Sequence, residues 1–131
     1  MSIIIVPLWL TLSEILAVHE KILALFGGAS GIRDNTLLES ALARLQNLLV
    51  YERTDLFALA AAYADGIVNN HAFIDGNKRT GFLAAALFLE MNGCKFNASN
   101  EEVVTMTLGL ADKSLSAIEF AKWLRDNSEP D

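Results

Sequence analysis

The sequence predicts an all-α protein, a compact helical bundle that forms one domain over residues 1–131. Three observations carry this prediction: apolar residues recur at helical spacing, capping residues precede these stretches, and no alternating pattern is long enough for a sheet. Hydrophobic residues make up 53% of the chain, which is enough material for a real core.

An extended lead-in and a capped helix are expected first. Residues 3–6 are β-branched and precede a proline, which favours a short extended segment. Thr11 and Glu14 have the spacing of a capping box, and apolar residues then recur every three or four positions up to Gly27-Gly28.

Five more helices are expected, of which the third and fourth in the chain flank a polar segment. The fourth helix extends from about Lys78 to Asn92 and ends at Gly93. Residues 126–131 are acidic and polar, and we expect this end to fray. The expected caps are Asp34 or Thr36 for the second helix, Asp55 for the third, and Ser99 with Glu102 and Ser116 with Glu119, as capping boxes, for the last two.

Charge and composition exclude several classes of protein. The 16 acidic and 10 basic residues give a net charge of −6, and only Lys78 and Arg79 are adjacent basic residues, so we expect no direct contact with nucleic acid. No apolar stretch reaches the ~18 residues of a membrane span, and the N-terminal run makes a poor signal peptide, so we expect a cytoplasmic protein. The single cysteine, Cys94, predicts neither a disulfide nor a metal site.

Residues 70–81 concentrate the polar chemistry between two apolar helices. A plain turn with solvated charges is one interpretation. The other is an anion site: if a helix begins near Asn77, the N–H groups of Gly76, Asn77 and Lys78 converge at the positive end of its dipole. Lys78 and Arg79 would add positive charge, the arginine with a fork that matches phosphate oxygens.

Two further side chains suit phosphate chemistry. Asp75 offers a hard oxygen ligand where Mg²⁺ commonly bridges a carboxylate and a nucleotide. Histidine is the residue type whose side chain ordinarily titrates near neutral pH, so His71 can act as a general base. Together these are the parts needed to move a phosphate-bearing group onto a hydroxyl. His19, in the first helix, is expected to pack or lie on the surface rather than take part in catalysis.

Residues 71–79, HAFIDGNKR, resemble the signature of the Fic/Doc family: His, any, Phe, any, Asp or Glu, Gly or Ala, Asn, Gly or Lys, Arg. Residues 31–34 (GIRD) and 37–42 (LLESAL) resemble the upstream segment of the Doc branch, as do residues 57–64. Nine consecutive matching positions are highly specific, so we prefer this interpretation to a plain turn.

The resemblance implies an all-α Fic fold and a transferase that uses ATP and Mg²⁺. His71 would deprotonate the target hydroxyl, Asp75 would hold the metal, and residues 76–79 would hold the phosphates, with Lys78 and Arg79 also taking part in catalysis. Phe73 would be the buried anchor of the loop.

Lys78 and Phe82 point to one branch of the family. Most members have glycine in place of Lys78 and transfer AMP to Ser, Thr or Tyr; they usually have a second arginine where this chain has Phe82. The Doc branch has the lysine and resembles a kinase, a toxin that phosphorylates a threonine of translation elongation factor Tu. Two alternatives stay open: an AMP-transferase, and a non-catalytic protein that acts through its antitoxin at a promoter.

The resemblance also implies a protein partner. Many Fic proteins carry an inhibitory helix with Ser or Thr, three residues, Glu, then Gly or Asn, and this sequence has no such run. We therefore expect a separate antitoxin protein to inhibit the activity. Its C-terminal segment would fold as a helix into a groove near the active site.

Overall fold

The computed structural model describes residues 6–33, 35–52 and 55–130. This part of the chain forms six helices and one two-stranded sheet, so the predicted all-α class is confirmed. The elements in order are α1 (Leu12–Phe26), α2 (Asn35–Glu52), α3 (Leu56–Asn69), α4 (Asn77–Met91), β1 (Cys94–Phe96), α5 (Asn100–Asp112), α6 (Ala117–Asp126) and β2 (Ser128–Pro130).

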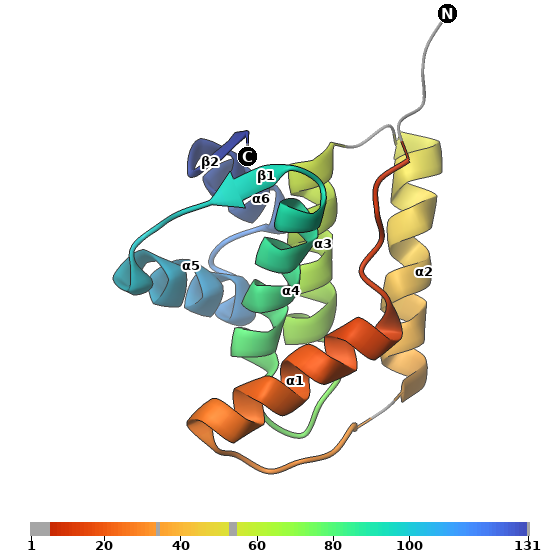
Figure 1. Ribbon diagram of the computed structural model, residues 1–131, viewed down its shortest axis with the longest axis vertical. Coiled ribbons are helices and arrows are strands. Elements are labelled where there is room, and N and C mark those ends of the chain that lie inside the picture. Colours follow the sequence, from red (N-terminus) through yellow and green to blue (C-terminus); the bar gives the residue numbers. More distant parts are fainter. Residues whose placement is uncertain (1–5, 34, 53–54, 131) are drawn as a thin grey trace, which may run out of the picture.

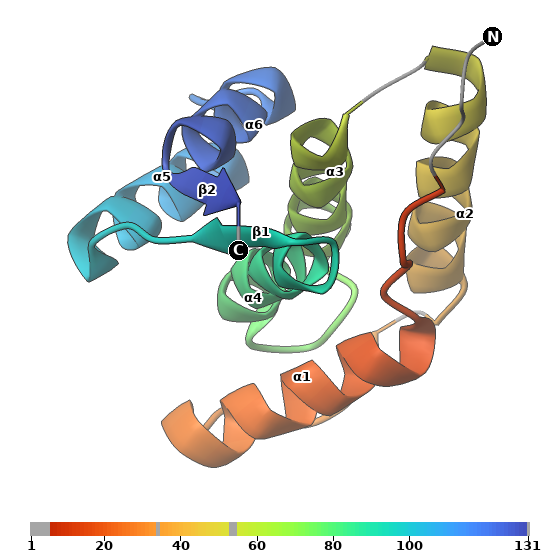
Figure 2. The same ribbon diagram turned by 45° about the horizontal axis from the view of Figure 1, so that its top comes forward.

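Helix α3 is the centre of the bundle and packs against α2, α4, α5 and α6. Figure 1 shows α3 and α4 in the middle, with α2 on one side and α5 and α6 on the other. Small residues let α3 and α4 approach closely: a Cβ added to Gly81 of α4 would lie 2.6 Å from Cγ2 of Val68. Helix α1 crosses the ends of α2 and α4 and contacts both, as the turned view in Figure 2 also shows.

The N-terminal segment is tied to the core by a buried tyrosine. The Leu10 N–H donates to the Tyr63 hydroxyl at 2.9 Å, and this hydroxyl donates to the Leu10 carbonyl at 3.0 Å. Burial raises the pKa of Tyr63 to about 12. The expected extended segment over residues 3–6 lies outside the described residues except for Val6.

Most helices begin where the sequence predicted. The side chains of Thr11, Asp55, Ser99 and Ser116 each accept a hydrogen bond from an N–H of the first turn. The second helix begins at Asn35, so Thr36 lies inside it rather than at its cap, and Asp34 is outside the described residues.

The expected capping box at Ser99 is only half formed. Ser99 accepts the N–H of Glu102, but the carboxylate of Glu102 accepts the indole N–H of Trp123 at 3.3 Å. A partner from α6 therefore replaces the backbone N–H that a capping box would offer. The box at Ser116 and Glu119 is complete.

The antiparallel pair β1 and β2 corrects the expectation of a frayed end over residues 126–131. Cys94 pairs with Pro130, Lys95 with Glu129 and Phe96 with Ser128. Opposite charges face each other at the central pair, which favours this register. Strands of three residues are too short to give an alternating pattern, so the sequence did not predict them. Residue 131 lies outside the described part.

Within the described residues, no helix combines the length and the apolarity that a membrane crossing requires. Three segments of the chain meet at the N-terminal end of α4: the loop before it, the C-terminal half of α1 and one face of α5.

Candidate active site

The loop that joins α3 to α4 alternates between buried and exposed side chains. Ala72 and Phe73 are fully buried, whereas His71, Ile74 and Asp75 are exposed. Phe73 is therefore the buried anchor that the sequence predicted.

The side chain of Asn77 closes this loop. The Phe73 N–H donates to Oδ1 of Asn77 at 2.9 Å, and Nδ2 of Asn77 donates to the Phe73 carbonyl at 2.8 Å. The side-chain amide of Asn77 is thus engaged with the loop. The backbone N–H of Asn77 remains available to an anion. It belongs to the first turn of α4, where an N–H has no acceptor within the helix.

Helix α4 begins without a side-chain cap. Its N-cap is Gly76, at φ 78° in the left-handed region, where glycine is favoured and no side chain can reach the first turn. The N–H groups of Asn77 and Lys78 therefore lie at the positive end of the helix dipole, and no side chain of the N-cap residue accepts a hydrogen bond from them. The Gly76 N–H, expected to join them, donates instead to Oδ1 of Asp75 at 2.8 Å.

The Asp75 carboxylate is held by two backbone donors. Besides Gly76 on Oδ1, the Ala29 N–H donates to Oδ2 at 3.2 Å. Each oxygen retains a lone pair, and the side chain is exposed at the cavity. Among the described residues, no three His, Cys, Asp or Glu side chains form a metal-binding group, and Asp75 is the acidic side chain in the lining of this cavity.

The segment before α2 lies along the loop as a short antiparallel partner. The Ile74 N–H donates to the Gly31 carbonyl at 3.2 Å, and the Arg33 N–H donates to the Ala72 carbonyl at 3.0 Å. Gly31 is required by this close approach, because a Cβ there would lie 2.8 Å from Cδ1 of Ile74. The sequence did not predict this pairing, since neither loop has a periodic pattern.

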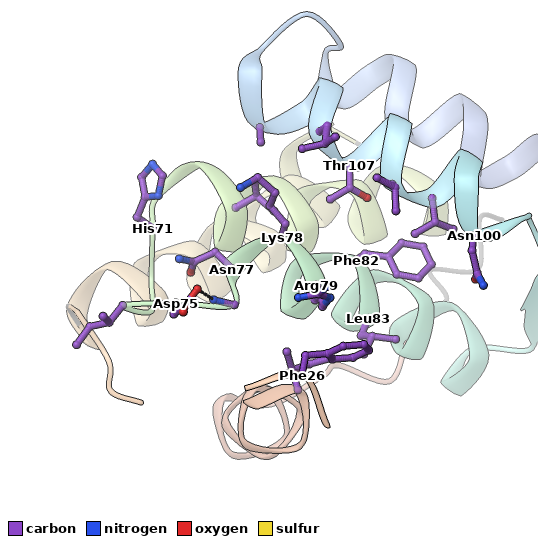
Figure 3. Close-up of a pocket in the computed structure, with 18 residues that line it drawn as sticks. Phe26, His71, Asp75, Asn77, Lys78, Arg79, Phe82, Leu83, Asn100 and Thr107 are labelled. Carbon is purple, nitrogen blue, oxygen red and sulfur yellow. Dashed lines mark hydrogen bonds between the residues drawn. The ribbon is translucent and has the colours of Figure 1, made fainter. Parts of the chain in front are cut away.

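All the predicted site residues line one cavity of about 830 Å³ (Figure 3). His71, Asp75, Gly76, Asn77, Lys78 and Arg79 lie at one side of it. Helices α1, α3, α4 and α5 supply the apolar part of the lining, which includes Phe26, Val104 and Leu108. The structure thus brings the predicted residues together, while their chemical roles remain predictions.

His71 has an unusual backbone conformation. Its φ of 49° lies in the left-handed region, which costs an L-residue other than glycine roughly 1–2 kcal/mol. The conformation turns the chain sharply between the end of α3 and the buried Ala72, and it leaves the imidazole exposed at the cavity. Strained residues of this kind are common at functional sites.

The two cations of the site are arranged differently. In Figure 3 the Lys78 side chain extends toward the His71 side of the cavity, whereas Arg79 points toward α1. The Arg79 guanidinium carbon lies 4.2 Å from the centre of the Phe26 ring, a cation–π contact that fixes its position. The sequence analysis missed Phe26, which is exposed at the end of an amphipathic helix and had no distinguishing signal.

His19 packs in the core, which is one of the two placements that the sequence predicted, but its contact with the loop before α4 was missed. It is buried between Ile15 and Ile22 on the inner face of α1. Its Nε2 bonds to the Asp75 carbonyl oxygen at 2.8 Å. A polar residue in an otherwise apolar buried stripe is the signal that could have identified it.

An all-helical fold with this loop at the uncapped start of α4 defines a class of protein. Residues 9–89 match the sequence model of the Fic/DOC family, and the chain belongs to that family. It is 35% identical to the protein kinase doc of Escherichia phage P1 over 113 residues, which cover 86% of this chain and 89% of that protein. It is 43% identical to toxin Doc of Mycolicibacterium smegmatis over 77 residues, which cover 56% and 58% of the two chains. The resemblance to the Doc branch is thereby confirmed.

Proposed function

We propose that this protein is a Doc-type toxin, an ATP- and Mg²⁺-dependent kinase that phosphorylates a threonine of elongation factor Tu and so blocks translation. The observation that carries the proposal is the uncapped start of α4, which shares one cavity with an exposed histidine, a held carboxylate and two cations. The similarity to a relative named as a protein kinase supports the reaction type. Since elongation factor Tu works in the cytoplasm, the proposed location is cytoplasmic.

We propose a separate role in phosphate transfer for each of the site residues. His71 takes the proton from the threonine hydroxyl as its oxygen bonds to the γ-phosphorus. The bond from the γ-phosphorus to the oxygen that bridges it to the β-phosphate breaks, and ADP leaves. The N–H groups at the start of α4, with Lys78 and Arg79, bind the phosphate oxygens and hold them in line with that hydroxyl.

The donors present suit a magnesium ion shared with phosphates. Mg²⁺ usually takes one or two carboxylates, several waters and phosphate oxygens, and Asp75 supplies one ordered carboxylate beside the proposed phosphate site. When bound, the ion would neutralise charge that develops on the phosphates. Asp75 would be its protein ligand.

Phosphate transfer is proposed rather than AMP transfer for two reasons. Lys78 occupies the position at which AMP-transferring relatives have glycine, and its side chain adds bulk and charge where an α-phosphate would have to settle. Phe82 replaces the second arginine, and its ring packs on Phe96 and Trp123, with ring centres 5.7 and 6.4 Å away. This position belongs to an aromatic cluster and offers no clamp for phosphate.

We further propose that a small antitoxin covers the apolar side of the cavity. Phe26, Leu83, Val104 and Leu108 are exposed and line the same cavity from three helices. This surface suits the apolar face of a partner helix. Lys78 and Arg79 at its end would favour acidic groups on that partner.

The reaction is tested with ATP that carries its label at either the α or the γ position, in the presence of purified elongation factor Tu. Label transferred from the γ position alone is expected for the wild type, with none for His71→Ala. Transfer from the α position alone would establish the AMP-transferase instead. Growth arrest that persists with His71→Ala would replace catalysis by a binding mechanism.

A further inference from the structure

His19 contacts the proposed site from beneath, through the backbone of the loop. It is 4% exposed, and its ring stacks on Phe73 with centres 3.7 Å apart and planes at 8°. A Cβ on Gly76 would lie 3.7 Å from both Cδ2 and Nε2 of His19, so the imidazole also lies under the glycine that starts α4. One ring therefore underlies the loop from its anchor to the helix start.

The hydrogen bond of His19 has a defined direction. Nε2 lies 2.8 Å from the carbonyl oxygen of Asp75. A carbonyl oxygen can only accept, so Nε2 carries the proton and donates it. This donor fixes the orientation of the peptide group that joins Asp75 to Gly76.

That same peptide group also holds the Asp75 carboxylate. In a trans peptide the C=O and the N–H point in opposite directions, and the described residues contain no cis peptide bond. With the carbonyl turned toward His19, the Gly76 N–H points the other way, where it donates to Oδ1 of Asp75 at 2.8 Å. His19 thus sets the plane that places one of the two donors to this carboxylate.

We infer that His19 is a positioning residue for Asp75, acting through the peptide group of Asp75 and Gly76. Its role is that of the outer partners that orient metal ligands, whose loss typically lowers metal affinity or activity by roughly 10- to 100-fold. The inference rests on the proposed function insofar as Asp75 is taken to hold Mg²⁺. The control of the carboxylate's position by His19 stands on the geometry alone.

The test compares two substitutions of similar length. His19→Gln keeps an N–H donor that can reach the Asp75 carbonyl, whereas His19→Met removes it. Both variants lose the flat ring that stacks on Phe73. If His19 acted only through this stacking, the two variants would change the loop to the same extent. Met suits the apolar surroundings of Ile15 and Ile22, so we expect its urea midpoint to equal or exceed that of His19→Gln.

The first measurement uses the ligand-free protein and the amide signals of Gly76 and Ala29, the two donors to the carboxylate. His19→Met should shift both signals and speed hydrogen exchange at both amides, while His19→Gln should stay near the wild type. Equal signals in the Gln and Met variants would overturn the inference. If either variant fails to fold, His19→Phe, which keeps a flat ring without a donor, replaces it in the comparison with the wild type. A wild-type pattern in His19→Phe would equally overturn the inference.

The second measurement is the dissociation constant of ATP with Mg²⁺, by calorimetry. We expect binding roughly 10-fold weaker for His19→Met and near wild type for His19→Gln. In an Asp75→Asn background the two variants should bind alike, because a residue that acts through Asp75 has nothing left to position. A Met effect of the same size in that background would contradict the inference. If the wild type binds no ATP, the proposed function fails, and the amide signals alone decide the role of His19.

Discussion

The side-chain amide of Asn77 and the backbone of Phe73 form a closed pair of hydrogen bonds, at 2.9 and 2.8 Å. The amide acts as donor and acceptor toward one residue, so it fixes the loop as a backbone pairing would. Because Phe73 is fully buried, this pair fastens the exposed site residues to the core. The asparagine of the signature is thus explained by loop geometry.

Asn77→Asp should destabilise the protein by about 1–3 kcal/mol. In the variant, a carboxylate oxygen replaces Nδ2 and faces the Phe73 carbonyl without a proton, so the hydrogen bond to that carbonyl is lost. Urea unfolding measures the change. Asn100→Asp is the matched control: Asn100 begins α5, where a negative charge is favoured by the helix dipole, so stability should be equal or slightly higher. Equal losses at both positions would contradict the proposed clamp.

His71→Ala and His71→Gly should both lower phosphate transfer by ~10²–10⁴-fold, the range for loss of a general base. Their stabilities should differ: at a φ of 49° glycine is favoured over alanine by about 1 kcal/mol. Urea unfolding and labelled-ATP transfer measure the two effects separately. A glycine variant no more stable than the alanine variant would show that the backbone at residue 71 is unstrained.

Phe26→Leu should weaken ATP binding by about 2- to 5-fold, because an exposed cation–π contact contributes about 0.5–1 kcal/mol to holding Arg79 in place. Calorimetry with ATP and Mg²⁺ gives the dissociation constant. Leu25→Ala is the control, since Leu25 is the exposed neighbour outside the cavity lining and should leave binding unchanged. In an Arg79→Ala background the Phe26→Leu effect should disappear.

The pH dependence of stability should show the buried Tyr63. Its pKa is about 12 in the folded protein against 10.0 for the free side chain, so the folded state keeps the proton longer. Its contribution is therefore complete below pH 10 and is lost as the pH rises from 10 toward 12, by roughly 2–3 kcal/mol.

Unfolding free energies measured between pH 9 and 12 test this. Tyr63→Phe should start lower by about 1–3 kcal/mol, because Leu10 loses its partner, and should fall less steeply above pH 10. Parallel curves for the two proteins would contradict the assigned titration.

The helices and the site signature were readable from the sequence because their causes are local. A cap such as Thr11 acts on an N–H three residues away, and apolar spacing of three or four residues places side chains on one face of a helix. The residues of the signature are likewise consecutive, so the start of α4 and the gathering of His71, Asp75 and Lys78 at one end of that helix followed from the chain itself.

Only the tertiary structure decided what holds those residues in place. The bond from His19 to Asp75 joins positions 56 residues apart, and the bond from Ala29 to Asp75 joins positions 46 apart. The short pair of β1 and β2 is likewise made by distant segments. Such contacts leave no period in the sequence, because they depend on how separate helices pack and on which loops that packing brings together.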